Sequence, residues 1–86
     1  MSEGLNKVVL IGNVGGDMEL RYTPGGQSVT SFRLATNRAW IISRGERHEQ
    51  TEWFTVVAWD KLAEICSRFL RKGRRVYIEG RLRNRA

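Results

Sequence analysis

The sequence predicts a small, mainly β domain with a single helix placed before its last strand. Three observations lead to this fold class. β-Branched and aliphatic residues alternate with polar ones in several segments, which is typical of strands. Glycine and proline separate these segments, most strongly at Pro24-Gly25-Gly26. Only residues 61–72 carry apolar side chains at helical spacing. With 86 residues, the chain 1–86 is expected to form one domain.

The first predicted strand covers residues 6–15, an aliphatic run closed by glycines. Gly12 inside this run indicates a bulge or a sharp bend. Residues 19–23 are compatible with a brief strand before the Pro-Gly-Gly turn. These segments form the first part of the expected sheet.

Residues 27–40 predict a long second strand, rich in valine, threonine, serine and phenylalanine. Simple alternation places Trp40 on the same face as Phe32 and Leu34. Strands of this length usually contain a bulge that changes the register, so the pattern alone leaves the facing of Trp40 open. The polar residues 43–50 predict a flexible hairpin loop.

The third long strand, residues 51–59, has the clearest alternation. Trp53 and Trp59 share one face with Thr55 and Val57, and the opposite face is also apolar. A small sheet with one solvated side does not need two apolar faces. We therefore expect something other than the core to cover the tryptophan face.

Asp60 is expected to be the N-cap of a helix over residues 61–72, with Gly73 as its C-cap. The last predicted strand, residues 75–83, has one core face and one mostly charged face. The helix stripe expected to face the core comprises Leu62, Ile65, Cys66, Phe69 and Leu70.

This order of elements predicts an all-β fold with one helix, the OB-fold. An OB-fold is a five-stranded Greek-key barrel that binds oligonucleotides on its second and third strands. Its helix lies between strands three and four, as in this chain. The fifth strand is absent from the sequence, which ends at Ala86 where the fourth strand should turn. We therefore expect a domain that is truncated at its C-terminus.

The positive charge is concentrated in the C-terminal part of the chain. The whole sequence carries a net charge of +6, but residues 61–86 contain nine basic and two acidic side chains. Arginine dominates among the basic residues, and its planar guanidinium suits phosphate and also stacks on π-faces. This distribution favours a polyanionic partner, although charge alone also fits RNA, a membrane surface or an acidic protein.

The compartment is expected to be the reducing cytoplasm. Cys66 is the only cysteine and cannot form an internal disulfide. The N-terminus lacks the pattern of a secretory signal. The longest apolar run, residues 8–11, is too short to cross a bilayer, so no membrane association is expected.

Three tryptophans stand out in so short a chain. Trp53 and Trp59 share a strand face, and Trp40 ends the neighbouring strand. Proteins that bind single strands combine aromatic planes for base stacking with a basic groove for the backbone. A single tryptophan is more often core or interface packing. Two on one face, with basic residues concentrated nearby, favour the binding interpretation.

The sequence also closely resembles the bacterial single-stranded DNA-binding proteins of replication and repair. The resemblance covers nearly the whole chain in order. It rests on LNKVVLIGNVGGDMELRYTPGG near the start, FRLATNRAW, QTEWFTVVAWDKLAEICSRFLRKG, and RVYIEGRLRNR at the end.

The resemblance implies roles for particular residues. It implies that the three tryptophans stack on DNA and that basic residues contact the backbone or line the groove. It also implies a homotetramer of OB-folds. The implied nucleic-acid-binding residues are Trp40, Trp53, Trp59, Arg33, Lys61, Lys72, Arg83 and Arg85. The implied subunit contacts are Lys7, Val8, Val9, Leu10, Phe54, Arg75 and Tyr77.

The family also has features that this sequence does not contain. The resemblance implies another stacking aromatic residue, the fifth strand, and a glycine-rich linker with an acidic tip that recruits replication and repair proteins. Such recruitment is expected only if a tail follows the present chain. Phe54 and Arg75 lie at positions where the family varies, so the sequence leaves the strength of the tetramer open.

The sequence gives little support for catalytic chemistry. We expect that the protein is not an enzyme and that it uses no cofactor and no metal. His48 is the only histidine and lies among charges in a predicted loop. One histidine and one cysteine do not supply a usual zinc site. The glycines at 12–16 match neither a P-loop nor a dinucleotide fingerprint.

The predicted function is therefore sequence-tolerant binding and protection of single-stranded DNA in replication, recombination and repair. Two alternatives remain open. One is a related OB-fold primosome or RNA-binding module, and the other is a protein-interaction module with exposed aromatic residues. We expect a cytoplasmic, nucleoid-associated protein.

Overall fold

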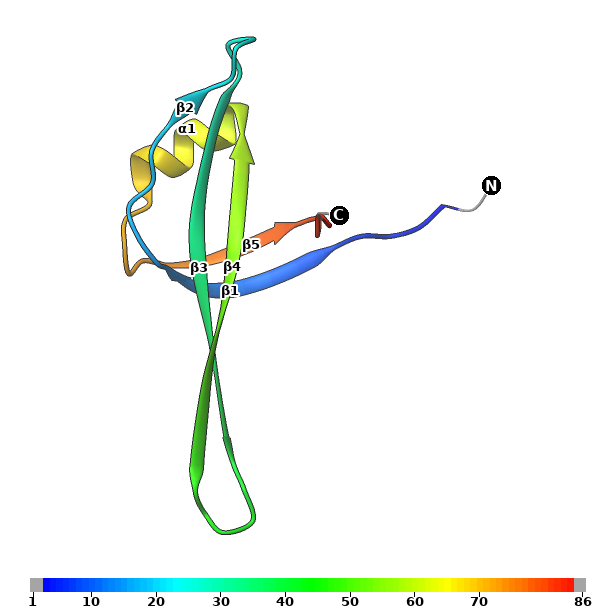
Figure 1. Cartoon of the computed structure of the whole chain (residues 1–86), viewed down its shortest axis with the longest axis vertical. Coiled ribbons are helices and arrows are strands. Elements are labelled where there is room, and N and C mark those ends of the chain that lie inside the picture. The colour runs from blue at the N-terminus through cyan, green and yellow to red at the C-terminus, as the bar shows by residue number, and fades with distance from the viewer. Residues whose placement is uncertain (1–2, 85–86) are drawn as a thin grey trace.

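The computed structural model describes residues 3–84, which form one antiparallel sheet and one helix (Figure 1). Strand β3 is at the centre: β4 pairs with one of its edges, and β1 and β2 pair with the other. Strand β5 pairs with β1. The elements in chain order are β1 (Val8–Val14), β2 (Arg21–Tyr22), β3 (Ser28–Ile41), β4 (Arg47–Trp59), α1 (Asp60–Phe69) and β5 (Arg75–Gly80).

Strands β3 and β4 form a long hairpin whose register is unbroken. Val29 pairs with Trp59 at one end and Ile41 pairs with Arg47 at the other, with no bulge between them. The expected bulge is therefore absent from this ladder. Side chains therefore alternate strictly along the whole hairpin. Figure 1 shows the two strands running side by side as a long, twisted hairpin.

The prediction of a flexible loop over residues 43–50 is wrong for its second half, because β4 already begins at Arg47. The turn is tight: the amide of Ile42 donates to the Glu46 carbonyl at 3.0 Å. Gly45 has a φ of 78°, a conformation that glycine adopts without strain. The outer arm is exposed on nearly all sides, so its strands show none of the apolar alternation that reveals a half-buried strand.

The core lies beneath the inner half of this hairpin. Val14, Phe32 and Leu34 are buried together, and Leu10 and Ile78 from the β1–β5 pair pack against them. Gly12 allows β1 to approach β3 closely, since a Cβ atom there would lie 2.3 Å from the Ala35 carbonyl oxygen. The glycine that indicated a bend in the sequence is therefore a point of close backbone approach.

The start of helix α1 differs from the prediction. Asp60 is its first residue, and the N-cap position is occupied by Trp59 without a side-chain capping bond. The Asp60 side chain instead accepts a hydrogen bond from Gln27 Nε2 at 3.2 Å, and its carbonyl accepts one from Ser28 Oγ at 3.0 Å. Asp60 thus joins the helix to the start of β3, with a positive φ of 56°.

The end of the helix also differs. The helix stops at Phe69, and the amide of the C-cap residue Leu70 donates to the Cys66 carbonyl. Gly73 is therefore not the C-cap: it lies in the following turn with a φ of 87°. Its amide donates to the Val14 carbonyl at 2.7 Å, so this turn is attached to the end of β1.

The predicted apolar stripe of the helix is divided between two environments. Cys66 and Leu70 pack against the core together with the fully buried Ala63. Partial burial raises the pKa of the Cys66 thiol. The other three members, Leu62, Ile65 and Phe69, are exposed.

Truncation of Leu34 is expected to destabilise the domain, because this side chain has 0% exposure in the core. Leu34→Ala should lower the free energy of unfolding by about 2–5 kcal/mol. Urea denaturation followed by circular dichroism measures the change. Leu5→Ala is the control, since Leu5 is 90% exposed and should leave stability nearly unchanged. Equal stability of the two variants would contradict this description of the core.

Candidate nucleic-acid interface

Trp53 and Trp59 lie on the outward face of the β3–β4 hairpin, as alternation predicted. The unbroken register places both on the face opposite to the buried Phe32 and Leu34. Trp53 is 49% exposed and Trp59 is 42% exposed, so neither is a core residue. The structure therefore favours the open-face interpretation of these two side chains over core packing.

The ring of Trp53 is held by two neighbours. The Arg33 guanidinium lies over it, with Cζ 4.5 Å from the ring centroid, which is a cation–π geometry. Gly15 lies against the ring edge, because a Cβ atom at this glycine would be 2.5 Å from Trp53 Cζ3. The amide of Gly15 donates to the Arg33 carbonyl at 2.7 Å, which fixes β1 beside this pair. Trp53 is therefore exposed but not free to turn.

The two predicted lysines belong to different segments next to the β3–β4 hairpin. Lys61 is exposed in the first turn of α1, two residues after Trp59 in the chain. The amide of Lys72 donates to Asp17 Oδ1 at 3.3 Å, which holds the Lys72 turn beside the segment that follows Gly15. The backbone thus places Lys61 directly after the strand that carries Trp59, and Lys72 near the segment that follows Gly15.

Trp40 occupies a different position, on the outer arm of the hairpin. By alternation it belongs to the face opposite to Trp53 and Trp59. Its ring stacks on His48 with centroids 5.7 Å apart, and Arg38 Cζ lies 4.9 Å from its centroid. Strands β3 and β4 cross in Figure 1 between the sheet and the hairpin tip. The hairpin is therefore twisted, and beyond the crossing its two faces are reversed relative to the sheet.

The last two predicted arginines lie beyond β5. Arg83 is exposed, and the neighbouring Leu82 is fixed by Asn6, whose Nδ2 donates to the Leu82 carbonyl at 2.7 Å and whose Oδ1 accepts from its amide at 3.0 Å. This contact places Arg83 beside the start of β1, away from Gly15 and the Trp53 ring. Arg85 lies outside the described residues.

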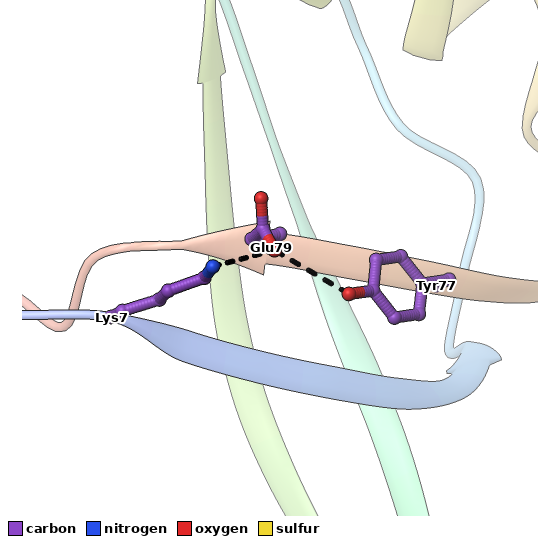
Figure 2. Close-up of polar contacts among 3 residues, drawn as sticks. All are labelled: Lys7, Tyr77 and Glu79. Atoms are coloured by element: carbon purple, nitrogen blue, oxygen red, sulfur yellow. Dashed lines mark hydrogen bonds and ion pairs between the residues drawn. The ribbon is translucent and has the colours of Figure 1, made fainter.

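The outward face of β1 and β5 carries part of the predicted subunit-contact set. Lys7 Nζ lies 3.2 Å from Glu79 Oε1, and the Tyr77 hydroxyl donates to the same oxygen at 3.5 Å (Figure 2). Tyr77 is 62% exposed and Val9 is 49% exposed on this face. Arg75, paired with Asn13 in the ladder, is exposed as well.

The other predicted contact residues have different surroundings. Leu10 pairs with Ile78 and packs against the core. Phe54 pairs with Leu34 on the core side of the hairpin and is half-buried. Val8 shares the inward alternation of Leu10. The structure therefore does not bring these three together with Tyr77 on one face.

The predicted site residues did not include Arg21 and His48, which the structure places next to predicted site residues. Arg21 on the two-residue strand β2 pairs with Val29, which in turn pairs with Trp59. His48, expected in a loop, stacks on Trp40. No local pattern reveals such partners, because they depend on strand register across the sheet.

The described part of the chain holds no cluster of three or more side chains suited to a metal ion. Within residues 3–84, no helix is long and apolar enough to cross a membrane.

The strand order, the position of the helix and the aromatic, basic face define an OB-fold domain of the oligonucleotide-binding class.

Comparison with known proteins identifies the family. The model of the single-strand binding protein family matches residues 5–86, and the chain belongs to this family. It is a family of binding proteins, which agrees with the prediction that the chain is not an enzyme. The chain is also 57% identical to single-stranded DNA-binding protein 1 of Chlorobaculum tepidum over all 86 residues, which span 53% of that relative. The chain thus spans about half the length of this relative.

Two solved structures support the predicted OB-fold. The complex of Plasmodium falciparum SSB with single-stranded DNA matches with a TM-score of 0.85 and 38% identity, over 94% of this chain and 72% of that one. A deletion mutant of the single-stranded DNA-binding protein from Thermus aquaticus matches with a TM-score of 0.80 and 34% identity, over 94% and 40% of the two chains. The fold class predicted from the sequence is therefore confirmed.

Addition of one methyl group at Gly15 is expected to displace the Trp53 ring, because the new Cβ atom would lie 2.5 Å from Cζ3. In a background where Trp53 is the only tryptophan, Gly15→Ala should change the emission maximum and increase quenching by acrylamide. Gly16→Ala is the matched control, since a Cβ atom there meets nothing within 4 Å. An unchanged Gly15→Ala spectrum would show that the glycine does not hold the ring.

Proposed function

We propose that this chain binds single-stranded DNA through the outward face of β3 and β4, with little preference for sequence. The observation that supports this most directly is the exposure of Trp53 and Trp59 on one continuous strand face. Aromatic rings offer a stacking surface to any base, because every base has a π-face. Membership in the single-strand binding protein family supports the same function.

The face also supplies charge where a DNA backbone would need it. Arg33 lies over Trp53, and Lys61 and Lys72 are proposed as further backbone contacts. Neutralisation of phosphates releases counterions, so affinity should fall with salt at a slope of about −0.7 per phosphate for single strands. Double-stranded DNA hides its base faces within the stack, so this mode of contact should favour single strands.

The outer arm is proposed as an additional contact surface. Trp40 and the arginine beside it lie where the hairpin extends beyond the sheet. A strand bound along the hairpin would reach this arm after passing Trp53. Arg83 and Arg85 are proposed as backbone contacts on the strength of the family resemblance alone.

We propose that the outward face of β1 and β5 mediates self-association, up to the homotetramer that the resemblance implies. Exposed apolar side chains, Val9 and Ile11, lie there next to Tyr77. The Lys7–Glu79 ion pair lies at one end of this surface. Phe54, Val8 and Leu10 are proposed to support the surface from the inward side.

The biological role that fits these features is protection of single strands during replication, recombination and repair, in the cytoplasm and at the nucleoid. Contacts with replication and repair proteins are proposed only if a tail follows the present chain. RNA binding is the nearest alternative, since stacking on tryptophan does not distinguish the two sugars.

Removal of either outward tryptophan is expected to weaken DNA binding without unfolding the domain. Trp53→Ala and Trp59→Ala should each lower the affinity for labelled oligo-dT by about tenfold, as stacking contributes about 1–3 kcal/mol per base. Fluorescence anisotropy measures affinity, and circular dichroism measures folding. Leu62→Ala is the control, because it removes an exposed apolar side chain of the helix.

Three results would contradict the proposal. The first is wild-type protein that does not bind oligo-dT at low salt. The second is folded tryptophan variants that bind as tightly as Leu62→Ala, which would favour a protein-interaction module. The third is displacement of oligo-dT by a much lower concentration of oligo-rU, which would favour an RNA-binding module.

A further inference from the structure

The outward face contains a shallow hollow of about 220 Å³ that no predicted site residue lines. Strands β3 and β4 form its floor, and strand β2 forms its rim. The residues that line it are Arg21, Val29, Thr30, Ser31, Thr55 and Val57.

The sheet register places this hollow between the two outward tryptophans. Thr55 and Val57 are the two outward residues between Trp53 and Trp59 on β4. At the other end, Arg21, Val29 and Trp59 form one row across three strands. Adjacent strands lie about 4.8 Å apart, so the Arg21 backbone is roughly 10 Å from that of Trp59.

Each tryptophan therefore has an arginine on the same face. Arg33 lies over Trp53, and Arg21 lies in the row of Trp59. The side chain of Arg21 is 76% exposed, and its nearest acidic partner is Glu19, 4.0 Å away and also exposed. An exposed pair at this distance contributes little, so the guanidinium can turn to another anion.

The lining has the chemistry of a nucleotide site. Val29 and Val57 offer apolar contact to the face of a base. The hydroxyls of Ser31 and Thr55 donate to or accept from any base edge, because a hydroxyl does both. The guanidinium of Arg21 suits a phosphate at the rim.

A larger hollow of about 490 Å³ lies on the outer arm, but its lining includes the acidic Glu49, whereas the lining of the smaller hollow has no acidic residue. Arg47 Nη2 lies 3.0 Å from Glu49 Oε1, and Thr51 Oγ1 donates to Asn37 Oδ1 at 2.8 Å. Arg21 has no comparably close partner among the described residues. The smaller hollow is therefore the better candidate for an anionic ligand.

We infer that this hollow holds one nucleotide of the bound single strand, with its base on the floor between Trp53 and Trp59 and its phosphate on Arg21. The inference rests on the proposed binding of single-stranded DNA and assigns a further contact residue to it. Ser31 and Thr55 are the residues that face the base edge.

The test uses the wild-type chain, labelled oligo-dT and a salt titration. Arg21→Ala should lower the affinity on the order of tenfold at low salt, the size of one charge-assisted hydrogen bond. It should also make the slope of log affinity against log salt shallower by about 0.7. Arg68→Ala on α1 removes the same charge away from this face and is the matched control.

A second variant tests the floor of the hollow. Ser31→Leu fills the space without changing the charge, and Ser31 is exposed, so the fold should tolerate it. It should weaken oligo-dT binding severalfold and leave the salt slope unchanged. Thermal unfolding checks that both variants keep the wild-type fold.

The outcomes separate this inference from the proposed function. If wild-type protein does not bind oligo-dT, the proposed function itself fails. If wild-type protein binds and Arg21→Ala matches Arg68→Ala in affinity and slope, only the phosphate contact is overturned. If Ser31→Leu binds like wild type, the base does not occupy the hollow.

Discussion

The unbroken pairing of β3 with β4 is the constraint on which the rest of the structure depends. Because side chains alternate strictly, this register decides at once which residues enter the core and which face outward. Phe32 and Leu34 are buried, whereas Trp53 and Trp59 are open on the other side. A shift by one residue would exchange these sets, burying tryptophan and exposing the core. The burial of the core and the exposure of Trp53 and Trp59 are therefore specified by the same hydrogen bonds.

The close contact between β1 and β3 adds the second layer of organisation. Two glycines permit it for different reasons. Gly12 meets the backbone of Ala35, so it serves the crossing of the strands, whereas Gly15 meets the ring of Trp53, so it serves the site. The amide of Gly73 then ties the turn after the helix to Val14. The position of the segment that carries Lys72 is therefore fixed by these contacts with β1 as well as by the helix that precedes it.

Sequence patterns predicted the parts of this structure where one face is buried and the other is not. The alternation over residues 51–59 is the best example, and it placed Trp53 and Trp59 correctly on a shared face. The patterns failed where burial is absent on both sides, as in the arm from Arg47 onward. They also failed at Asp60, whose side chain bonds to Gln27 instead of capping the helix. The position of Arg21 depends on pairing across three strands, which no local pattern contains.

The register also relates the two surfaces to which functions are assigned. Asn13 of β1 pairs with Ala35 of β3, and residues that pair directly lie on the same side of a sheet. Asn13 shares its side with Ile11 and Tyr77, and Ala35 shares its side with Arg33 and Trp53. The proposed self-association surface and the proposed DNA face are thus neighbouring regions of one outward surface. The two proposed surfaces use different side chains: Val9, Ile11 and Tyr77 on β1 and β5, and Trp53 and Trp59 on β4.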